Sequence, residues 1–440
     1  MTAVKCLSCS MISFKGADRD QMSFMPYDLN EWLPEDHLAR FVVEIVDQMD
    51  LRDVYESYSG KGSRPYDPKL LLSLLFYGYS TGVFSSRKLE TATYDSVAFR
   101  YIAGNHHPDH DTIANFRKRF LPQLKVWFKE ILLIGNELGM VKVGNIFIDG
   151  SKIQANASKH KAMSYQRIKQ LEQKLACEIE QLLELAEQQD QKEAEDSIDF
   201  PEEIKRREER LAKIGEAKRV IEERRKEAYK EEKEAFDQKQ DARKKYEERT
   251  GKKPRGRKPK EPSVEPDDSD QYNFTDPESR IMKTNKGFDQ CYNAQIATNE
   301  DMLIVGNYAN AHHNDKQEFL PTIDAIPEEL KTHITSAVAD TGYHSEANIT
   351  NCPENITPII AKSREQHNNH FDELINPMED EQKQIYRKRK STVEPVFGII
   401  KEVLGFRRFS FREEANIDSE WALVCLAYNL KRMFKMKMAC

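Results

Sequence analysis

Three acidic residues are placed where carboxylates could hold a metal ion beside a phosphate. Asp149 ends the apolar segment NIFID, Asp340 ends the apolar segment ITSAVAD, and Glu394 lies within the basic stretch YRKRKSTVEPVFGIIKEVLGFRR. A carboxylate at the end of a buried strand is costly unless it is paired or bound to a cation. Each residue alone also has an ordinary explanation, because aspartate often starts a turn and charged helices are usual at surfaces. In combination, the acids and the basic neighbours of Glu394 suit a site that binds a metal ion and a phosphate backbone.

The neighbourhood of Glu394 supports this interpretation. If the stretch is a helix, Lys390, Glu394 and Lys401 share one face, and the apolar residues fall on the other. Pro395 removes a backbone donor, so we expect Glu394 near a kink or in the first turn. A surface helix with ordinary ion pairs is the alternative.

The segments around the three acids predict alternating strands and helices that would position them. Short apolar runs or alternating polarity indicate strands, and apolar residues three or four positions apart indicate helices. The predicted elements are a strand at 145–150, a hairpin of two strands at 291–298 and 302–310, a helix at 315–326, strands at 334–340 and 356–361, the helix of Glu394, and a helix from Trp421 to Phe434.

Residues 24–135 predict a compact helical domain, preceded by a loose leader at 1–23. The segment DPKLLLSLLFYGY predicts a buried helix, with aspartate as its cap and proline in its first turn. A later helix, TIANFRKRF, is short, capped and basic, so we expect it to enter a DNA groove and to present Arg117 and Arg119. A helical scaffold without a role in DNA binding is the alternative.

A highly charged insertion is predicted between residues 164 and 250. Its apolar residues keep the a/d spacing of a coiled coil on both sides of a break at 197–201. This pattern predicts two long helices in an antiparallel hairpin that projects from the main body. The narrow apolar seam would serve a dimer contact equally well.

Residues 251–271 are rich in proline and charge, so we expect an extended, disordered linker. Its core, PRGRKP, is similar to an AT-hook, and this similarity implies that Arg255 and Arg257 enter the narrow minor groove of A·T-rich DNA. Lys258 stands where that motif usually has proline. Binding to phosphates without sequence preference is the alternative.

Composition sets the broad class of protein. With 440 residues, of which 39% are hydrophobic and 32% charged, the chain is long enough for two or three domains. A net charge of −7 does not argue against a nucleic-acid partner, because local basic patches decide such binding. The 7 cysteines indicate a reducing compartment, and Cys6 and Cys9 lack a second pair for a zinc site. No membrane span or signal peptide is recognisable, so the expected location is the cytoplasm.

The acidic motifs resemble those of DDE transposases of bacterial insertion sequences. The resemblance lies in IFIDGSKIQANAS around Asp149, AVADTGYHS around Asp340 and YRKRKSTVEPVFGIIK around Glu394. The last segment is similar to the signature Tyr-x2-Arg-x3-Glu-x6-Lys, except that four residues instead of three separate Arg389 from Glu394. Either Lys390 takes the place of the arginine or the helix begins elsewhere. The segments RPYDPKLLLSLLFYGYSTGVFSSRKLE and HDTIANFRKRF also resemble such transposases, so the similarity covers nearly the whole chain from about residue 24.

This resemblance implies an α/β fold: an RNase H-like mixed sheet, a helical N-terminal domain, and a long helical-hairpin insertion after the first catalytic strand. The catalytic domain would comprise residues 140–163 and 272–415, with a C-terminal helix at 416–440. The implied activity is that of a transposase, which cleaves DNA at the ends of an insertion sequence and transfers the strands. Two Mg²⁺ ions, or Mn²⁺ in their place, would be held by the three acids, Asp149, Asp340 and Glu394.

The resemblance further implies DNA contacts near the scissile phosphate. The residues expected to make them are Tyr386, Arg389, Lys390, Lys401, Arg407 and Arg408. The expected partner is double-stranded DNA at the element ends, bound by a homodimer in a synaptic complex associated with the nucleoid. An RNase H-like nuclease that cleaves without joining is one alternative, and a non-catalytic DNA-binding protein derived from a transposase is the other.

Overall fold

A computed structural model describes residues 28–58, 64–190, 200–251, 259–284, 287–361 and 380–439. The predicted leader at 1–23, the CxxC pair and the AT-hook arginines Arg255 and Arg257 lie outside these ranges. No helix in the described ranges has the length and apolar character that crossing a bilayer requires.

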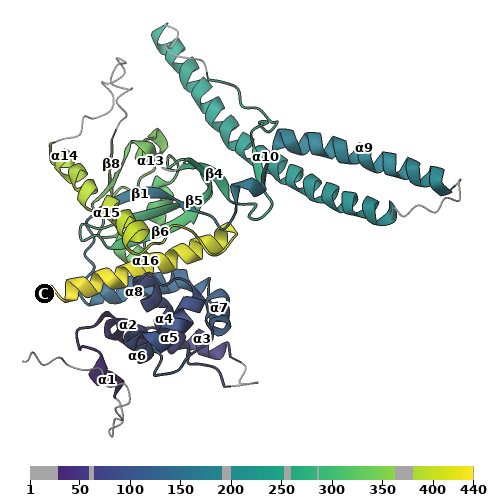
Figure 1. The fold of residues 1–440 in the computed structure, drawn as a ribbon. Coiled ribbons are helices and arrows are strands. Elements are labelled where there is room, and N and C mark those ends of the chain that lie inside the picture. Colours follow the sequence, from purple (N-terminus) through teal and green to yellow (C-terminus); the bar gives the residue numbers. More distant parts are fainter. Residues whose placement is uncertain are drawn as a thin grey trace, which may run out of the picture.

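A mixed sheet forms the centre of the molecule (Figure 1). Its strands are β1 (Asn145–Gln154), β4 (Arg280–Thr284), β5 (Gly287–Thr298), β6 (Ile304–Asn310), β7 (Ser336–Ala339) and β8 (Thr357–Ile360). The long strand β5 pairs antiparallel with β1 on one side, and with β4 and β6 on the other. On the far side of β1, β7 and β8 run parallel to it. This order, β6-β5-β1-β7-β8, is the predicted RNase H-like mixed sheet.

The strand sequences account for this arrangement. All four residues of β7, SAVA, are buried, as expected for a parallel strand covered on both faces. In β1 the apolar residues Ile146, Phe147 and Ile148 are fully buried, and exposure begins at Asp149. The predicted strands at 291–298, 302–310, 334–340 and 356–361 are confirmed, and β4 is an additional strand that its sequence did not reveal.

The segments that follow the sheet strands contain short helices. These are α11 (Phe319–Asp324), α12 (Glu328–Lys331) and α13 (Glu346–Thr350). The helix predicted at 315–326 is therefore shorter than expected and leaves Asp315 in the loop that precedes it.

Eight helices of the described N-terminal region pack below the sheet as drawn in Figure 1. They are α1 (Leu29–Trp32), α2 (Leu38–Gln48), α3 (Arg52–Glu56), α4 (Pro68–Ser80), α5 (Ser86–Asp95), α6 (Val97–Ile102), α7 (His110–Arg119) and α8 (Gln123–Glu137). The predicted caps are present: Asp67 accepts a hydrogen bond from the backbone of Lys69, and Asp109 accepts one from Thr112. Nearly every residue of α4 is buried, as its apolar sequence predicts.

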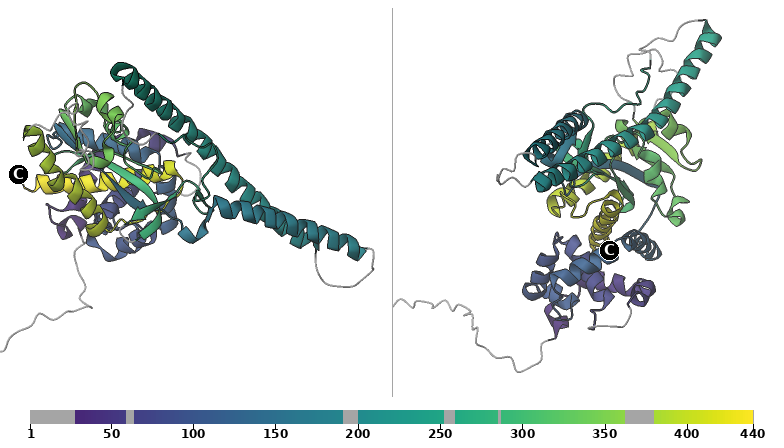
Figure 2. Two further views of the ribbon diagram at one scale, coloured as in Figure 1. Left: turned by 90° about the horizontal axis from the view of Figure 1, so that it is seen from above. Right: turned by 90° about the vertical axis from the view of Figure 1, so that its right-hand side faces the viewer.

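The last helix, α16 (Glu414–Lys437), joins the N-terminal helices to the sheet. It packs against β6 on one side and against α4 and α8 on the other (Figures 1 and 2). Its Trp421 donates a hydrogen bond to the carbonyl of Gln295 in β5, and Asn429 exchanges two hydrogen bonds with the backbone of Ile304. The helix is therefore part of the core that supports the sheet.

The charged insertion follows β1 and forms the long arm in Figure 2. α9 (Tyr165–Asp190) packs against the first part of α10 (Phe200–Thr250), and α10 then continues beyond the base of the arm. A small apolar core holds this pair, with Ile168 and Leu175 facing Ile214 and Ile221. At the base, β2 (Ala162–Ser164) and β3 (Gln271–Asn273) pair antiparallel, which brings the two ends of the insertion together.

The stretch around Glu394 is divided into several short helical elements. Its elements are α14 (Asp380–Arg387), a 3-10 turn at Lys388–Ser391, α15 (Val393–Gly398) and a π-helical turn at Ile399–Val403. Thr392 interrupts the helix with φ −111° and ψ −80°. The position predicted for Glu394, in a first turn near a kink, is confirmed. The common helical face predicted for Lys390, Glu394 and Lys401 is wrong, because no single helix contains all three.

Candidate active site

Asp149 lies midway along β1, just beyond the part of β1 that pairs with β7, and Asp340 directly follows β7. The strand predicted at 145–150 is therefore too short, because β1 continues past Asp149 to Gln154 in its pairing with β5. Phe147 of β1 is aligned with Val338 of β7, and each acid lies two residues further along the chain. Because neighbouring strands lie about 4.8 Å apart, this register places both carboxylates at one edge of the sheet. Asp340 also accepts a hydrogen bond of 2.8 Å from the backbone of Gly342, which fixes the turn that follows.

Arg389 connects Asp149 to Glu394. Its guanidinium lies 3.5 Å from the Asp149 carboxylate and 3.0 Å from the Glu394 carboxylate. The side chain of Arg389 is only 13% exposed, whereas that of Glu394 is 43% exposed. The arginine therefore occupies the interior of the site, and Glu394 faces it from the rim.

The electrostatics of the site are dominated by Asp149. The pKa of Asp149 is raised to about 7, by burial above all and also by the nearby carboxylates of Asp340 and Asp315, against the opposing effect of Arg389. The carboxylates of Asp149, Asp340 and Asp315 therefore repel one another, and Arg389 opposes this repulsion. Such a cluster favours an additional cation.

Asp315 is an acidic residue of this region that the sequence interpretation did not select. It lies in the loop between β6 and α11, where its Oδ1 accepts hydrogen bonds from Asn293 at 2.7 Å and Gln295 at 2.8 Å. The same oxygen is 3.3 Å from the Lys152 ammonium. Both amides are fully buried in β5, so two amide side chains at alternate positions of one strand were the signal that could have identified it.

The carboxylate oxygens of this site are the hard ligands that divalent cations prefer. As the side chains stand, no three or more of the described histidine, cysteine, aspartate and glutamate residues are grouped closely enough to hold an ion. The guanidinium of Arg389 lies between Asp149 and Glu394, and its buried Nη1 makes no hydrogen bond. The chemistry of the donors therefore fits a divalent cation, while their present spacing does not yet group three of them, and Arg389 supplies positive charge between Asp149 and Glu394.

Lys401 approaches the site from the π-helical turn. It donates hydrogen bonds to the Ser151 hydroxyl and to the carbonyl of Lys152, just beyond Asp149 on β1. Burial lowers the pKa of Lys401. A cavity of about 350 Å³ opens beside it, and its basic lining residues are Lys152, Lys283, Lys401 and Arg407. This cavity, which we call the strand-edge cavity, is suited to phosphate groups.

The other residues predicted to contact DNA around Glu394 surround this region. Tyr386 is partly buried next to Arg389, and Lys390 is exposed. Arg407 pairs with Glu402, and Arg408 donates a hydrogen bond to Asn156 at 3.0 Å. Both of these arginines remain exposed at the surface.

The two arginines predicted to contact DNA from α7 differ in their surroundings. Arg117 points into the protein, where its guanidinium donates to the Tyr79 hydroxyl at 2.8 Å and lies over the ring of Phe411. Arg119 is exposed and lies over the rings of Tyr58 and Phe120. A contact between these residues and DNA stays a prediction, and Arg119 is the more accessible of the two.

Comparison with known protein families agrees with this fold and site. The family described as Transposase domain (DUF772) matches residues 27–119, and the family described as Transposase DDE domain matches residues 268–430. Together the two matches cover more than half of the chain. The second includes Asp340 and Glu394, and the long insertion separates it from Asp149. Comparison with curated proteins gave no match, and neither did comparison with solved structures.

The RNase H-like sheet with its acidic edge defines a nucleic-acid-processing enzyme of the DDE class. The chain belongs to the DDE transposases of insertion elements, which act in DNA transposition and recombination. Enzymes of this family typically use a divalent metal ion and bind DNA at the ends of their element.

Proposed function

We propose that this transposase cleaves DNA at the ends of an insertion sequence and transfers the cut strands, with Asp149, Asp340 and Glu394 as its metal ligands. The observation that supports this most strongly is the register of β1 and β7, which places Asp149 and Asp340 next to each other, with Glu394 joined to Asp149 through Arg389. Two Mg²⁺ ions, or Mn²⁺ in their place, would supply Lewis-acid stabilisation of charge at the scissile phosphate.

The residues around these acids have separate roles in the proposal. Arg389 orients Asp149 and Glu394 and limits their mutual repulsion before DNA binds. Asp315 holds Lys152 and the two buried amides in place at the edge of the sheet. Lys152 and Lys401 line the strand-edge cavity, where they bind phosphates next to the scissile bond.

The remaining DNA contacts follow the predictions from the sequence. We assign to the surface around the acids the exposed or partly exposed residues Tyr386, Lys390, Arg407 and Arg408. Tyr386 is a DNA contact in this proposal, and no covalent protein–DNA intermediate is required. We further propose that residues 24–135 bind the element ends, that a homodimer forms the synaptic complex, and that the protein acts at the nucleoid in the cytoplasm.

A joining assay distinguishes this function from that of a nuclease. The substrate is a plasmid carrying the DNA that flanks the coding region, incubated with purified protein and Mg²⁺ and with a second plasmid as target. We expect fragments with free 3′ ends and also products in which those ends are joined to the target plasmid. Cleavage without joined products would identify a nuclease. Binding without either product would identify a non-catalytic DNA-binding protein.

A further inference from the structure

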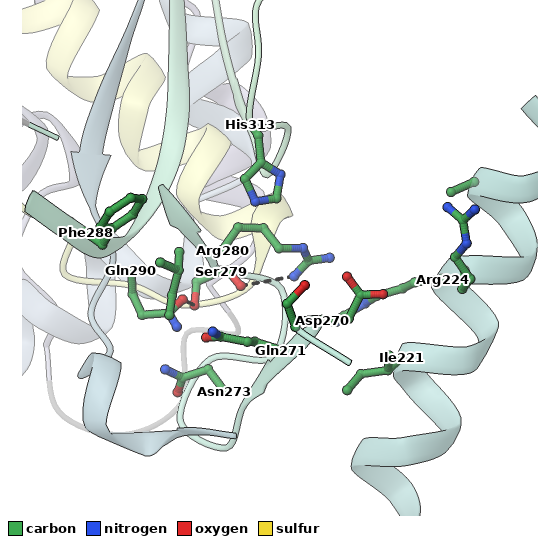
Figure 3. Close-up of a pocket in the computed structure, with 14 residues that line it drawn as sticks. Ile221, Arg224, Asp270, Gln271, Asn273, Ser279, Arg280, Phe288, Gln290 and His313 are labelled. Atoms are coloured by element: carbon green, nitrogen blue, oxygen red, sulfur yellow. Dashed lines mark hydrogen bonds between the residues drawn. The ribbon is translucent and has the colours of Figure 1, made fainter. Parts of the chain in front are cut away.

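A second basic cavity lies between the base of the insertion and the outer edge of the sheet. Its volume is about 550 Å³, and its lining comes from α10, from β3 and β4 with the turn between them, from β5, and from the loop after β6 (Figure 3). Arg224 of α10, Arg280 of β4 and His313 of the β6–α11 loop all face it. We call this the insertion-base cavity.

The two arginines of this cavity are held by backbone carbonyls. Arg224 donates to the carbonyl of Pro277 at 2.7 Å, and Arg280 donates to the same carbonyl at 3.0 Å and to that of Glu278 at 2.7 Å. Within the described residues, neither guanidinium forms an ion pair with a carboxylate. By contrast, the neighbouring Arg225 pairs with Glu232 at 2.9 Å.

The guanidinium groups of Arg224 and Arg280 are partly buried close to each other, which is unusual for two cations. Burial lowers the pKa of Arg280 to about 10, and the positive charge of Arg224 contributes to the same shift. Burial also lowers the pKa of Arg224 and of His313. Two guanidinium groups that are partly removed from water repel each other, and a bound anion would reduce that repulsion.

Among the described residues, the acids near the cavity make no ion pair with either arginine, although Glu278 and Glu414 act electrostatically on Arg280. Asp270 is the one carboxylate among the described lining residues, and its Oδ2 accepts a hydrogen bond from the backbone of Asp267. Glu278 accepts a hydrogen bond from the backbone of Glu414. The donors of both guanidinium groups therefore remain available to a ligand with several acceptor oxygens, such as a phosphate.

The insertion-base cavity and the strand-edge cavity lie along one strand. Arg280 and Ile281 at the start of β4 line the first, and Lys283 and Thr284 near its end line the second. Lys152, which lines the strand-edge cavity, also acts electrostatically on His313 of the insertion-base cavity. Basic side chains thus line two cavities along the same strand, and two such sites suit a polyanion better than an isolated anion.

We propose that Arg224 and Arg280 bind a backbone phosphate of the DNA duplex, so that the base of the insertion clamps the substrate to the sheet. This proposal rests on the proposed function in one respect: the position of the scissile bond, from which the contacted phosphate is counted, is taken to be at Asp149. Arg280 is aligned with Cys291 on β5, whereas Asp149 is aligned with Ile296. Five residues of strand span roughly 17 Å. Successive phosphates of one DNA strand are about 3.4 Å apart along the helix axis, so the contacted phosphate lies about five base pairs from the scissile bond, on one side of it.

The test compares DNA binding by the wild-type chain and the double variant Arg224→Gln/Arg280→Gln. One duplex extends at least ten base pairs on both sides of the cleavage position, and two others end about three base pairs from it on one side or the other. We expect the variant to bind the long duplex about tenfold more weakly, with the slope of log affinity against log salt flatter by about 0.9 for the lost phosphate. One of the two short duplexes lacks the contacted phosphate, and that duplex should bind the wild type and the variant with equal affinity.

Matched controls separate a specific contact from a general loss of charge or of fold. Arg219→Gln removes a charge from the exposed part of the same helix, where Arg219 lies near Glu223, and should leave the affinity for every duplex unchanged. If the double variant lacks a cooperative unfolding transition, Arg224→Gln alone provides the comparison, with a smaller expected loss. Equal affinity of wild type and variant for the long duplex would overturn the proposal, as would equal losses on all three duplexes.

A separate experiment distinguishes a DNA phosphate from free phosphate as the ligand of this cavity. Inorganic phosphate is added without DNA, and the midpoint of thermal unfolding is measured for wild type and variant. Stabilisation of the wild type alone, together with unchanged affinity for DNA, would assign the site to free phosphate and would overturn the DNA contact. The result is independent of catalysis, because Asp149→Asn provides a chain that binds DNA without cutting it. If the wild type does not cleave the DNA, the proposed function is contradicted, and the binding test remains valid.

Discussion

Arg389 and Glu394 form an ion pair of 3.0 Å across the break between α14 and α15. The break explains why the spacing of these residues differs from the transposase signature. Thr392 leaves helical geometry, and the 3-10 turn before it brings Arg389 back toward the acid. Arg389 is the residue that pairs with Glu394, α15 begins at Val393, and Lys390 is exposed.

Replacement of Arg389 should damage the site far more than replacement of its neighbour. Arg389→Gln removes the charge between Asp149 and Glu394, so the pKa of Asp149 should rise further and the two acids should lose their orientation. We expect cleavage to fall roughly a hundredfold. Lys388→Gln is the control, because it removes a charge from the same 3-10 turn at an exposed position, where Lys388 pairs with Glu300. Similar rates for the two variants at pH 8 would show that Arg389 has no special role.

The stability of the metal-free protein should depend on pH through Asp149. Its pKa is raised from 3.8 to about 7 in the folded state, so the folded state binds this proton more tightly than the unfolded state does. The stabilisation is complete below about pH 4 and is lost as the pH rises through 7. Relative to Asp149→Asn, the wild type should lose on the order of 2 kcal/mol between pH 5 and pH 7.5. Thermal unfolding in EDTA measures both proteins, and parallel pH profiles would contradict the assignment.

Gly150 is required by the close packing behind the acids. A Cβ at this position would meet the amide of Gln295 well inside van der Waals contact, and the Asp315 carboxylate at 2.8 Å. Gln295 has no room to move, because it is fully buried and also accepts a hydrogen bond from Tyr343. Gly150→Ala should therefore destabilise the fold by about 1–3 kcal/mol and lower the cleavage rate.

Gly144 provides the matched control for this substitution. It lies just before β1, and a Cβ there would meet nothing within 4 Å. Gly144→Ala should change neither chemical denaturation nor cleavage measurably. If Gly150→Ala behaves in the same way, the packing described for Gln295 and Asp315 does not constrain the site.

The insertion should be removable without loss of the sheet. The chain crosses its base where the backbone N–H of Tyr165 donates to the carbonyl of Asp270 at 2.7 Å, next to the pairing of β2 with β3. Deleting residues 166–269 and joining the ends with a short glycine–serine linker should retain one cooperative unfolding transition. We expect a lower midpoint, because the contact between Arg224 and Pro277 is lost. Absence of a cooperative transition would show that the insertion is part of the core.

The sequence allowed the sheet to be predicted for definite physical reasons. The residues before Asp149 and before Asp340 are short apolar runs, and such runs indicate buried strands without any knowledge of their partners. The insertion was equally clear, since its heptad spacing and its charge distinguish it from the rest of the chain.

Other features depend on contacts between distant segments and were not predicted. Asp315 is defined by two amides on β5, and the sequence does not show that they face it. Arg224 and Arg280 come together only because α10 returns to the edge of the sheet. The inward direction of Arg117 likewise follows from the position of Tyr79, which a basic helical sequence does not reveal.

The central claim is that Asp149, Asp340 and Glu394 form one metal-dependent centre for DNA cleavage. The most direct test measures cleavage of a plasmid carrying the flanking DNA, together with binding of that DNA, for Asp149→Asn, Asp340→Asn and Glu394→Gln. In the presence of Mg²⁺ the wild type should cut, and it should stop cutting in EDTA. Each variant should bind the DNA with nearly wild-type affinity and cut at least a thousandfold more slowly, since each removes a ligand charge. Cleavage by any one of the three variants at the wild-type rate would contradict the account.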